Sequence, residues 1–322
     1  MIGNDSIKFD ISIESLWHAW LAYRKGKQRT SEFEKFSYNI EVELVQLHKD
    51  LANGSYKHGS YRYFEVIDNK KRTIVVAQFR DRVVHRLLYD YLIAMYDKTF
   101  IFDAWSCRKN KGLHGAIDRA QSLLNRNQNA FIWRSDISKF FDSVDQRVLF
   151  QLLQRRIKDP IAIILIEKVI SSYHSKFGHA IGMPIGNLTS QIFANVYLNE
   201  LDRYVSHTLH PIGYLRYGDD FVIFGKNRQE VLNLRLEIIK YIESTLHLHI
   251  NLKSDIIRQS KQGLKYLGCW LYPSSRNLTN RNFNRIKERL SLQNIASYYG
   301  IATHCQPNLT PTLNWMIEQL LC

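Results

Sequence analysis

The sequence predicts an α+β protein with a substantial hydrophobic core. Several stretches carry apolar residues at helical spacing, and other short runs are rich in β-formers and bounded by turn signals. The 322 residues are 45% hydrophobic and 23% charged, which is ordinary globular composition and is enough for one large domain or two to three subdomains. This composition argues against a disordered, collagen-like or coiled-coil protein.

The first part of the chain is predicted to be helical and then to form a hairpin. Apolar residues at helical spacing cover residues 11–52. Residues 61–79 hold two β-rich runs around a turn-like Asp-Asn pair, with Lys70 and Arg72 near the tip. Helical spacing returns over residues 80–97, and a basic loop then leads into a further helix.

The rest of the chain alternates between short strands and helices. Residues 130–136 are predicted to form a strand that ends on Asp136, and residues 143–146 resemble a capping box that opens a helix. Two short strands are expected on either side of the turn signal at residues 218–219. The remaining expected elements are helices over 160–172, 187–207, 229–246, 281–296 and from 307 onward, a tight loop over 182–187 and a strand over 266–271.

The net charge of +14 is unevenly distributed. Lys and Arg exceed Asp and Glu over residues 51–130 (14 against 7) and 251–322 (9 against 3). The balance is nearly even over residues 1–50 (7 against 8) and 131–250 (14 against 12). Two basic segments around a near-neutral middle favour a polyanionic partner, and nucleic acid is the first candidate.

Several classes of protein are not expected. The four cysteines form no CxxC pair, so we expect neither a zinc site nor a disulfide framework. The first residues lack the pattern of a signal peptide, and no apolar run approaches the length of a membrane span. We therefore expect a cytoplasmic protein that makes no contact with a membrane.

Three acids, Asp136, Asp219 and Asp220, stand at the ends of predicted strands. Carboxylates beyond the ends of adjacent strands converge and repel one another unless cations intervene. Two divalent cations roughly 3.5–4 Å apart would relieve this repulsion and stabilise both oxygens of an in-line phosphoryl displacement. Oxygen ligands favour Mg²⁺, with Mn²⁺ as a possible substitute. An Asp pair in a hairpin is also explained by turn preference alone, and the residues by themselves leave that alternative open.

Seven short segments between about residues 60 and 272 form an ordered set. They are KKRTIVVAQFRDRVVH (70–85), SCRKNKGLHGAI (106–117), DISKFFD (136–142), GMPIGNLTSQ (182–191), YGDD (217–220), NLKSD (251–255) and YLGCWL (266–271). This set resembles the fingers and palm motifs of the reverse transcriptases, and seven motifs in order make a chance match improbable.

The resemblance implies a right-hand polymerase fold. The expected division is an N-terminal helical segment over 1–52, fingers over 53–130, a palm over 131–278 and a short thumb over 279–322. A fingers-like helical insertion is expected in the palm near 145–178.

The resemblance also implies RNA-templated DNA synthesis from deoxynucleoside triphosphates with two metal ions. The implied metal site consists of Asp136, Ile137, Asp219 and Asp220. Lys253 matches a lysine that protonates the pyrophosphate leaving group, although it could equally be a surface lysine.

Further positions match residues that bind the nucleotide or the primer. Phe141 would be the steric gate that excludes a ribose 2′-OH, or else a core aromatic. Lys70 and Arg72 would hold the triphosphate, or else be solvated at a hairpin tip. The other implied nucleotide-binding residues are Ile185, Gly186 and Gln191, and the implied primer grip is Tyr266, Leu267 and Gly268, a stretch that as sequence is only a β-strand.

The stretch IGNLTSQ at residues 185–191 resembles the enzymes of diversity-generating retroelements. The resemblance implies error-prone, adenine-mutagenised cDNA and a small basic accessory variability protein as partner, in a bacterial or phage-infected cell. Ile185 would then lower fidelity, although packing beneath the loop is the alternative. Gly218 departs from the family pattern, where Met, Ala or Val is usual.

Other readings remain open. They are another bacterial reverse transcriptase (retron, group II-derived or phage-defence), an RNA-dependent RNA polymerase and an inactive RNA-binding protein on a polymerase fold. The chain lacks the NAxxH and VTG signatures of retron enzymes, and all three acids are intact, which counts against an inactive protein.

Overall fold

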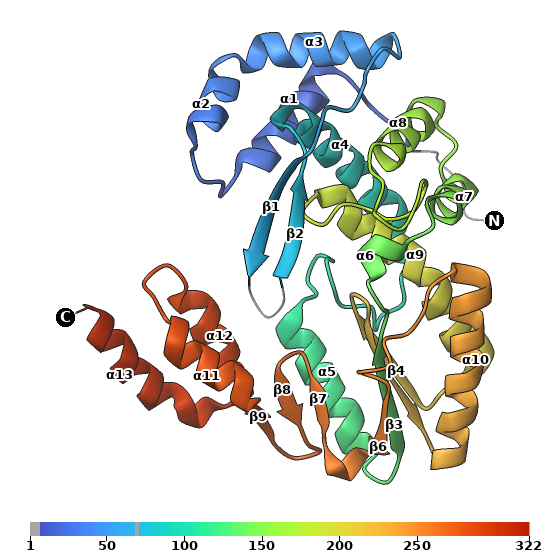
Figure 1. Ribbon diagram of the computed structural model, residues 1–322, viewed down its shortest axis with the longest axis vertical. Helices are drawn as coiled ribbons and strands as arrows, with labels where there is room; N and C mark the ends of the chain where they lie inside the picture. The colour runs from blue at the N-terminus through green and yellow to red at the C-terminus, as the bar shows by residue number, and fades with distance from the viewer. Residues whose placement is uncertain (1–6, 68–70, 322) are drawn as a thin grey trace. The chain divides into compact units, whose positions relative to one another are not determined.

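The structure is a computed structural model that describes residues 7–67 and 71–321 (Figure 1). The chain divides into two compact units. Unit 1 comprises residues 1–101, 137–202 and 241–249, and unit 2 comprises residues 102–136, 203–240 and 250–322. The assignments to fingers, palm and thumb remain predictions.

Unit 1 begins with the helices predicted over residues 11–52, which are confirmed. They are α1 (Ile13–Arg24), α2 (Ser31–Tyr38) and α3 (Ile40–Ala52), followed by α4 (Phe79–Tyr96). The hydroxyls of Ser12 and Thr30 accept hydrogen bonds from backbone N–H groups in the first turns of α1 and α2, which satisfies donors that a helix start leaves open.

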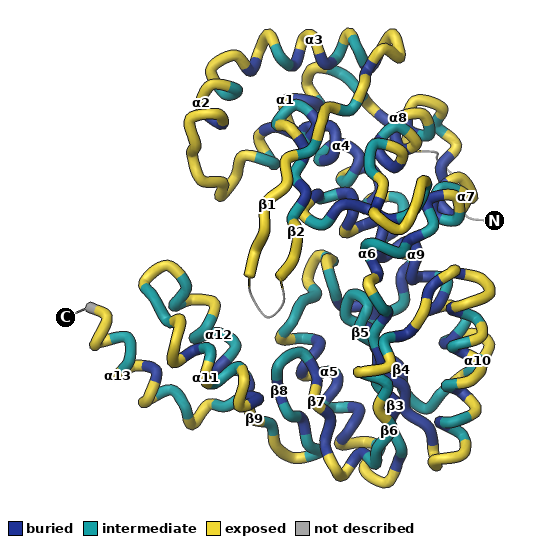
Figure 2. Tube along the Cα trace, in the orientation of Figure 1, coloured by how far each residue is buried: buried dark blue, intermediate teal, exposed yellow. Residues whose placement is uncertain are grey.

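The predicted hairpin is also confirmed. β1 (Arg62–Ile67) pairs antiparallel with β2 (Lys71–Val76), with Tyr63 opposite Val75. Every residue of β1 is exposed, as Figure 2 shows along the strand. The tip, with Lys70, lies outside the described residues.

The second half of unit 1 is helical. It contains α6 (Phe140–Ser143), α7 (Gln146–Arg156), α8 (Pro160–Ser171) and α9 (Leu188–Tyr204). The predicted capping box at residues 143–146 is wrong. The α7 cap is Asp145, whose carboxylate accepts from the N–H groups of Arg147 and Val148, because an Asp directly before the helix reaches these donors.

Unit 2 is built on a four-stranded antiparallel sheet with the order β4-β5-β3-β6. The strands are β3 (Phe131–Asp136), β4 (Gly213–Tyr217), β5 (Asp220–Gly225) and β6 (Ile256–Gln259). Helix α5 (Leu113–Arg126) covers one face, and α10 (Arg228–Leu246) lies on the other (Figure 1). Arg235 of α10 donates to the carboxylate of Asp255, the residue before β6. The strand predicted to end on Asp136 and the hairpin around residues 218–219 are confirmed.

A smaller sheet follows, and it corrects the prediction of one strand over residues 266–271. It consists of β7 (Leu264–Tyr266), β8 (Cys269–Leu271) and β9 (Arg276–Leu278). The stretch 266–271 is therefore a hairpin and not one strand, because Leu267 and Gly268 take positive φ angles of 47° and 86° and reverse the chain. The single helix predicted over 281–296 is also wrong: one helix ends at Arg289 and another begins at Ile295.

The C-terminal helices are α11 (Asn280–Arg289), α12 (Ile295–Cys305) and α13 (Thr310–Leu321). Short 3₁₀ turns cover Asp97–Thr99, Ser260–Gln262 and Pro307–Leu309, and a π-helical turn covers Val205–Leu209. Within the described residues, no helix is both long enough and apolar enough to cross a membrane.

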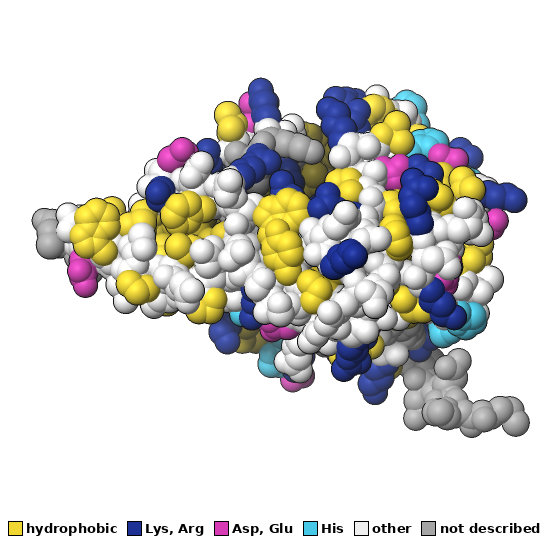
Figure 3. Space-filling model, turned by 90° about the horizontal axis from the view of Figure 1, so that it is seen from below, with side chains coloured by type: hydrophobic (Ala, Val, Ile, Leu, Met, Phe, Trp, Pro, Cys, Tyr) yellow, Lys and Arg dark blue, Asp and Glu magenta, His cyan; other side chains and the backbone are white. Residues whose placement is uncertain are grey.

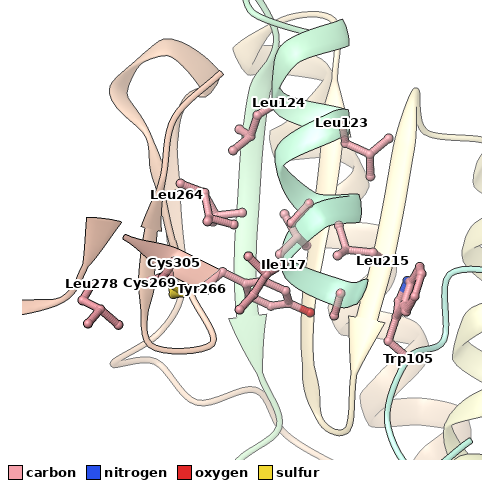
Figure 4. Packing of buried hydrophobic residues seen from close by; sticks show 14 of the residues in the cluster. Trp105, Ile117, Leu123, Leu124, Leu215, Leu264, Tyr266, Cys269, Leu278 and Cys305 are labelled. Atoms are coloured by element: carbon pink, nitrogen blue, oxygen red, sulfur yellow. A yellow bond between two sulfur atoms is a disulfide. The ribbon is translucent and has the colours of Figure 1, made fainter. Parts of the chain in front are cut away.

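A disulfide joins Cys269 of β8 to Cys305 of α12, with 6.4 Å between their Cα atoms. The expectation of no disulfide is thus wrong, because residues 36 apart in sequence meet only once the small sheet and α12 pack together. Both cysteines are fully buried in a cluster with Leu264, Tyr266 and Leu278 (Figure 4).

Candidate active site

Asp136 and Asp220 are direct cross-strand neighbours on β3 and β5. Directly opposed residues of an antiparallel pair project to the same face of the sheet. Ile132 and Phe224 are likewise paired and belong to the core on the α5 side, and strand side chains alternate with period two. The two carboxylates therefore stand beyond the end of this core, on the face that α5 covers.

Asp219 lies in the two-residue turn between β4 and β5, since Tyr217 pairs with Asp220. Gly218 takes φ +64° there, a conformation that glycine adopts without strain. The side chain of Arg216, which is 1% exposed, donates to the Gly218 carbonyl at 2.8 Å. A buried arginine therefore stabilises the turn that carries Asp219.

Asp220 is bound by an arginine on the neighbouring strand. The Nε and Nη2 atoms of Arg134 donate to the two carboxylate oxygens of Asp220 at 3.0 and 2.6 Å. Burial raises the pKa of Asp220 and the arginine opposes this rise, with a net upward shift. Burial would lower the pKa of Arg134, but the bonds to Asp220 outweigh it and raise it. Each group thus keeps the other in place.

Asp136 is positioned by the segment that follows residue 250. The hydroxyl of Ser254 donates to its carboxylate, and the N–H of Asn251 donates to its backbone carbonyl at 2.8 Å. Lys253 is exposed in the same turn. The turn thus brings a lysine to the neighbourhood of Asp136 within unit 2.

The donor set fits magnesium in one respect. Among residues 7–67 and 71–321, no group of three or more His, Cys, Asp and Glu is arranged to hold a metal by itself. Mg²⁺ in phosphoryl-transfer sites is commonly bound by one or two carboxylates together with substrate phosphates. Asp136 and Asp219 are carboxylates, the type of ligand that such a site uses, and Ile137 follows Asp136 directly in the chain.

In unit 1, the loop before α9 is joined to β2. The N–H of Val75 donates to the Ile185 carbonyl at 2.8 Å, and the Asn187 amide bonds both Ala77 N–H and the Val75 carbonyl. A Cβ on Gly186 would lie 2.8 Å from a methyl of Ile74. Glycine is therefore required at position 186 by the close approach of β2.

The other predicted nucleotide-binding residues of unit 1 differ in exposure. Phe140 is 3% exposed and belongs to the core, whereas Phe141 is half-buried. Phe141 is therefore less enclosed by the core than Phe140 is. Arg72 and Gln191 are exposed, and Lys70 is outside the described residues.

Residues 57–271, more than half of the chain, match the model of the family described as reverse transcriptase (RNA-dependent DNA polymerase). The chain belongs to the reverse transcriptase family. As a member of this family it is an RNA-directed DNA polymerase.

The reverse transcriptase is similar to protein YkfC and to several intron-encoded proteins. Protein YkfC of Escherichia coli (strain K12) is 25% identical over 270 residues, which cover 71% of each chain. The group II intron-encoded protein LtrA of Lactococcus lactis subsp. cremoris is 22% identical over 71% of this chain and 49% of its own. The putative COX1/OXI3 intron 2 protein of Saccharomyces cerevisiae is 22% identical over 77% of this chain and 37% of its own. The chain thus spans less than half the length of the last two.

A solved structure shares the fold. Telomerase from Candida albicans, in complex with the TWJ fragment of telomeric RNA, aligns with a TM-score of 0.51 and 12% identity. The alignment covers 74% of this chain and 49% of the telomerase chain. The predicted right-hand polymerase fold is consistent with this likeness.

The predicted primer grip of the reverse transcriptase has only part of its residues at the surface. Tyr266 is fully buried, and its side chain extends from β7 into the core (Figure 4). The Gly268 carbonyl accepts hydrogen bonds from Thr279 and Asn282 at the start of α11. The Leu267–Gly268 turn is therefore half-exposed and bonded to the start of α11, whereas the Tyr266 side chain is closed off from the surface.

On the face that Figure 3 shows, Lys and Arg side chains are spread among apolar ones, and Asp and Glu are visible at several places between them and along the edge. Exposed cations of this kind are the groups that bind a polyanion.

Sequence reasoning missed Arg134 and Ser254. Arg134 stands two residues before Asp136, which on a strand means the same face; this spacing was the available signal. Ser254 lies in the NLKSD segment, but nothing in that segment marks its bond to Asp136, which spans 118 positions of the chain.

Proposed function

We propose that this reverse transcriptase makes error-prone, adenine-mutagenised cDNA from a template RNA for a diversity-generating retroelement. The observation that carries the proposal is the IGNLTSQ loop, in which Ile185 is bonded to β2 through its backbone while its half-buried side chain is aliphatic. An aliphatic side chain offers neither donor nor acceptor to an incoming nucleotide.

The proposed chemistry is in-line nucleotidyl transfer at the acids of unit 2. Asp136 and Asp219 would hold Mg²⁺, with Mn²⁺ as a substitute, alongside the Ile137 backbone and the nucleotide phosphates. Asp220 would be the third acid of this metal site and would remain paired with Arg134. Bound cations of this kind supply charge stabilisation to the attacking and leaving oxygens.

The chain's own residues would do the remaining work. Lys253 would hold a proton for the pyrophosphate leaving group, as its exposed place in the turn next to Ser254 allows. Phe141 would exclude the 2′-OH of ribonucleotides. Lys70 and Arg72 would bind the triphosphate, and the Leu267–Gly268 turn would contact the primer.

Ile185 would lower fidelity by removing a polar constraint. Where relatives carry Gln, its amide could hydrogen-bond near the base pair and hold a correct pair better than a wrong one. Losing one hydrogen bond of about 0.5–1.5 kcal/mol narrows discrimination roughly two- to tenfold. Ile185 would therefore be one cause of low fidelity and not the whole of it.

The test is Ile185→Gln, with misincorporation counted at each template base on a defined RNA. The proposal predicts that errors opposite adenine fall while errors at other bases change little. Ile185→Leu is the matched control, because it keeps an aliphatic side chain and should keep the parent error spectrum. Unchanged adenine errors in a robustly active Ile185→Gln variant would make Ile185 a packing residue.

A second candidate is a reverse transcriptase derived from a group II intron. It is favoured by the likeness to LtrA, a group II intron-encoded protein. The same error spectrum separates the two: errors concentrated at adenine favour the retroelement enzyme, and low errors spread over all bases favour the intron-derived one.

The proposed partners are the template RNA, the RNA–cDNA duplex and a small basic accessory protein, in the cytoplasm of a bacterial or phage-infected cell. Affinity for RNA should fall steeply with salt, because each neutralised phosphate releases counterions. Processive synthesis by the isolated chain, equal to that with the basic partner, would remove the partner from the proposal.

A further inference from the structure

A buried chain of hydrogen-bonding groups links the loop before β1 to the start of α9 in unit 1. His85 of α4 has its Nδ1 2.6 Å from the Thr189 hydroxyl and its Nε2 3.0 Å from the Nε2 of His58. The Nδ1 of His58 lies 2.7 Å from the Gly59 carbonyl oxygen. His85 and Thr189 are each 1% exposed. No step of the proposed chemistry uses these groups.

The Gly59 carbonyl stands at one end of this series of hydrogen bonds and can only accept a hydrogen bond. His58 therefore carries a proton on Nδ1. With a neutral His58, its Nε2 accepts from His85, and Thr189 donates to the His85 Nδ1. With a second proton on His58, each bond reverses, and the His85 Nδ1 donates to Thr189. His85 remains bonded to Thr189 in both cases.

Asp81 and Tyr61 lie against His58, at one end of this series of hydrogen bonds. The Asp81 carboxylate accepts from the Tyr56 hydroxyl at 2.7 Å and from the Gly59 N–H at 3.1 Å, and one oxygen lies 4.0 Å from the His58 Nδ1. The Tyr61 ring lies 4.7 Å from the His58 ring. Burial lowers the pKa of His85 to about 3, with the charges of His58 and Arg82 adding to this, so its ring stays neutral in ordinary buffers.

Thr189 is the second residue of α9 and follows directly on the loop that Asn187 ties to β2. The loop is therefore held on one side by β2 and on the other by His85. A buried hydroxyl that lost its partner would carry a desolvation cost, so the His85 contact favours one placement of the helix start over others.

We propose that His85 is a positioning residue for nucleotide binding: through Thr189 it fixes the start of α9 and the loop over residues 185–191. The inference rests on the proposed role of that loop in the nucleotide pocket.

The test compares Thr189→Val with Thr189→Ser in steady-state primer extension on RNA. Valine keeps the branched shape and removes the hydroxyl, whereas serine keeps the hydroxyl. Thr189→Val should raise the KM for deoxynucleotides about two- to tenfold, as expected for one lost hydrogen bond, with little change in kcat or in RNA affinity. Thr189→Ser should recover most of the loss. A merely structural role would instead lower the active fraction and kcat at unchanged KM.

His85 offers a matched pair of substitutions. Asn places a polar atom near the position of Nδ1, which faces Thr189, and Gln places one near Nε2, which faces His58. His85→Gln should therefore raise KM as Thr189→Val does, and His85→Asn should raise it less. The double variant His85→Gln/Thr189→Val should be no worse than either single one, because both remove the same contact. If His85→Gln does not fold, the two Thr189 variants decide the matter.

Gln191→Ala separates the inference from the function on which it rests. If Gln191→Ala raises KM and a folded Thr189→Val does not, the positioning role of His85 is wrong and the pocket assignment stands. If neither variant changes KM, both the pocket assignment and the inference fail.

Discussion

Arg134 and Asp220 form a two-bonded ion pair across the neighbouring strands β3 and β5. Their side chains are 20% and 17% exposed, so the pair is largely withdrawn from water. Asp136, the cross-strand neighbour of Asp220, is instead held by the hydroxyl of Ser254. Asp220 and Asp136 thus have different surroundings: an arginine binds both oxygens of the first, and a serine hydroxyl donates to the second.

Replacing Arg134 should destabilise the protein. Arg134→Met removes two charge-assisted hydrogen bonds and leaves a largely buried carboxylate without its cation, which should cost about 1.5–3 kcal/mol. Urea unfolding measures this free energy. Arg134→Lys keeps the charge but cannot make both hydrogen bonds in the same geometry, so its unfolding free energy should lie between those of the parent and Arg134→Met. Equal stabilities of Arg134→Met and the parent would mean that the pair contributes nothing.

The two neighbouring phenylalanines should respond differently to the same change. Phe140→Ala empties a core position and should cost about 3–5 kcal/mol of unfolding free energy. Phe141→Ala should cost less and should raise the use of ribonucleotides relative to deoxynucleotides. Competitive incorporation of rNTP and dNTP measures the second effect. Unchanged discrimination in Phe141→Ala would place the steric gate at another residue.

Reduction of the disulfide should destabilise unit 2. Cys269 and Cys305 close a loop of 36 residues, and cross-linking a loop of this size contributes about 2–4 kcal/mol in chain-entropy terms. The unfolding transition of the parent should therefore move to lower temperature with dithiothreitol. Cys305→Ser should unfold at the lower temperature both with and without dithiothreitol. If dithiothreitol lowers the unfolding temperature of this variant as much as that of the parent, the disulfide is not the cause.

The ion pair between Asp255 and Arg235 should make stability depend on pH. Hydrogen bonds from Arg235, aided by the Trp133 indole and opposed by burial, hold the pKa of Asp255 below its usual value. The unfolded chain then takes up this proton at a higher pH than the folded one does. The contribution is complete above the unfolded pKa of about 3.9 and is lost as pH falls through the lower folded pKa. Unfolding free energies below about pH 5 should therefore fall more steeply for the parent than for Asp255→Asn.

The sequence predicts the framework of unit 2 well. The short apolar runs and the Gly218-Asp219 turn are local signals, and the structure confirms the hairpin that they predict. Asp136 also lies directly opposite Asp220 across the paired strands β3 and β5.

Features that depend on distant packing could not be predicted. The Cys269–Cys305 bond and the Ser254–Asp136 contact join residues that come together only in the folded chain. The Leu267–Gly268 turn was hidden because the flanking residues are all strand formers. His85 gave no signal of its own, because a histidine on an apolar helix face is usually a core residue.

The central claim is that Asp136 and Asp219 carry metal-dependent DNA synthesis on RNA. The most direct measurement is Mg²⁺-dependent primer extension on an RNA template by Asp136→Asn and Asp219→Asn, with thermal unfolding and RNA affinity recorded for each. Asp90→Asn, which changes an acid in an exposed helical ion pair with Arg86, is the matched control. The account predicts loss of extension in the two site variants, with RNA affinity and unfolding temperature close to those of the parent, and full extension in the control. Substantial extension by either folded site variant would contradict it.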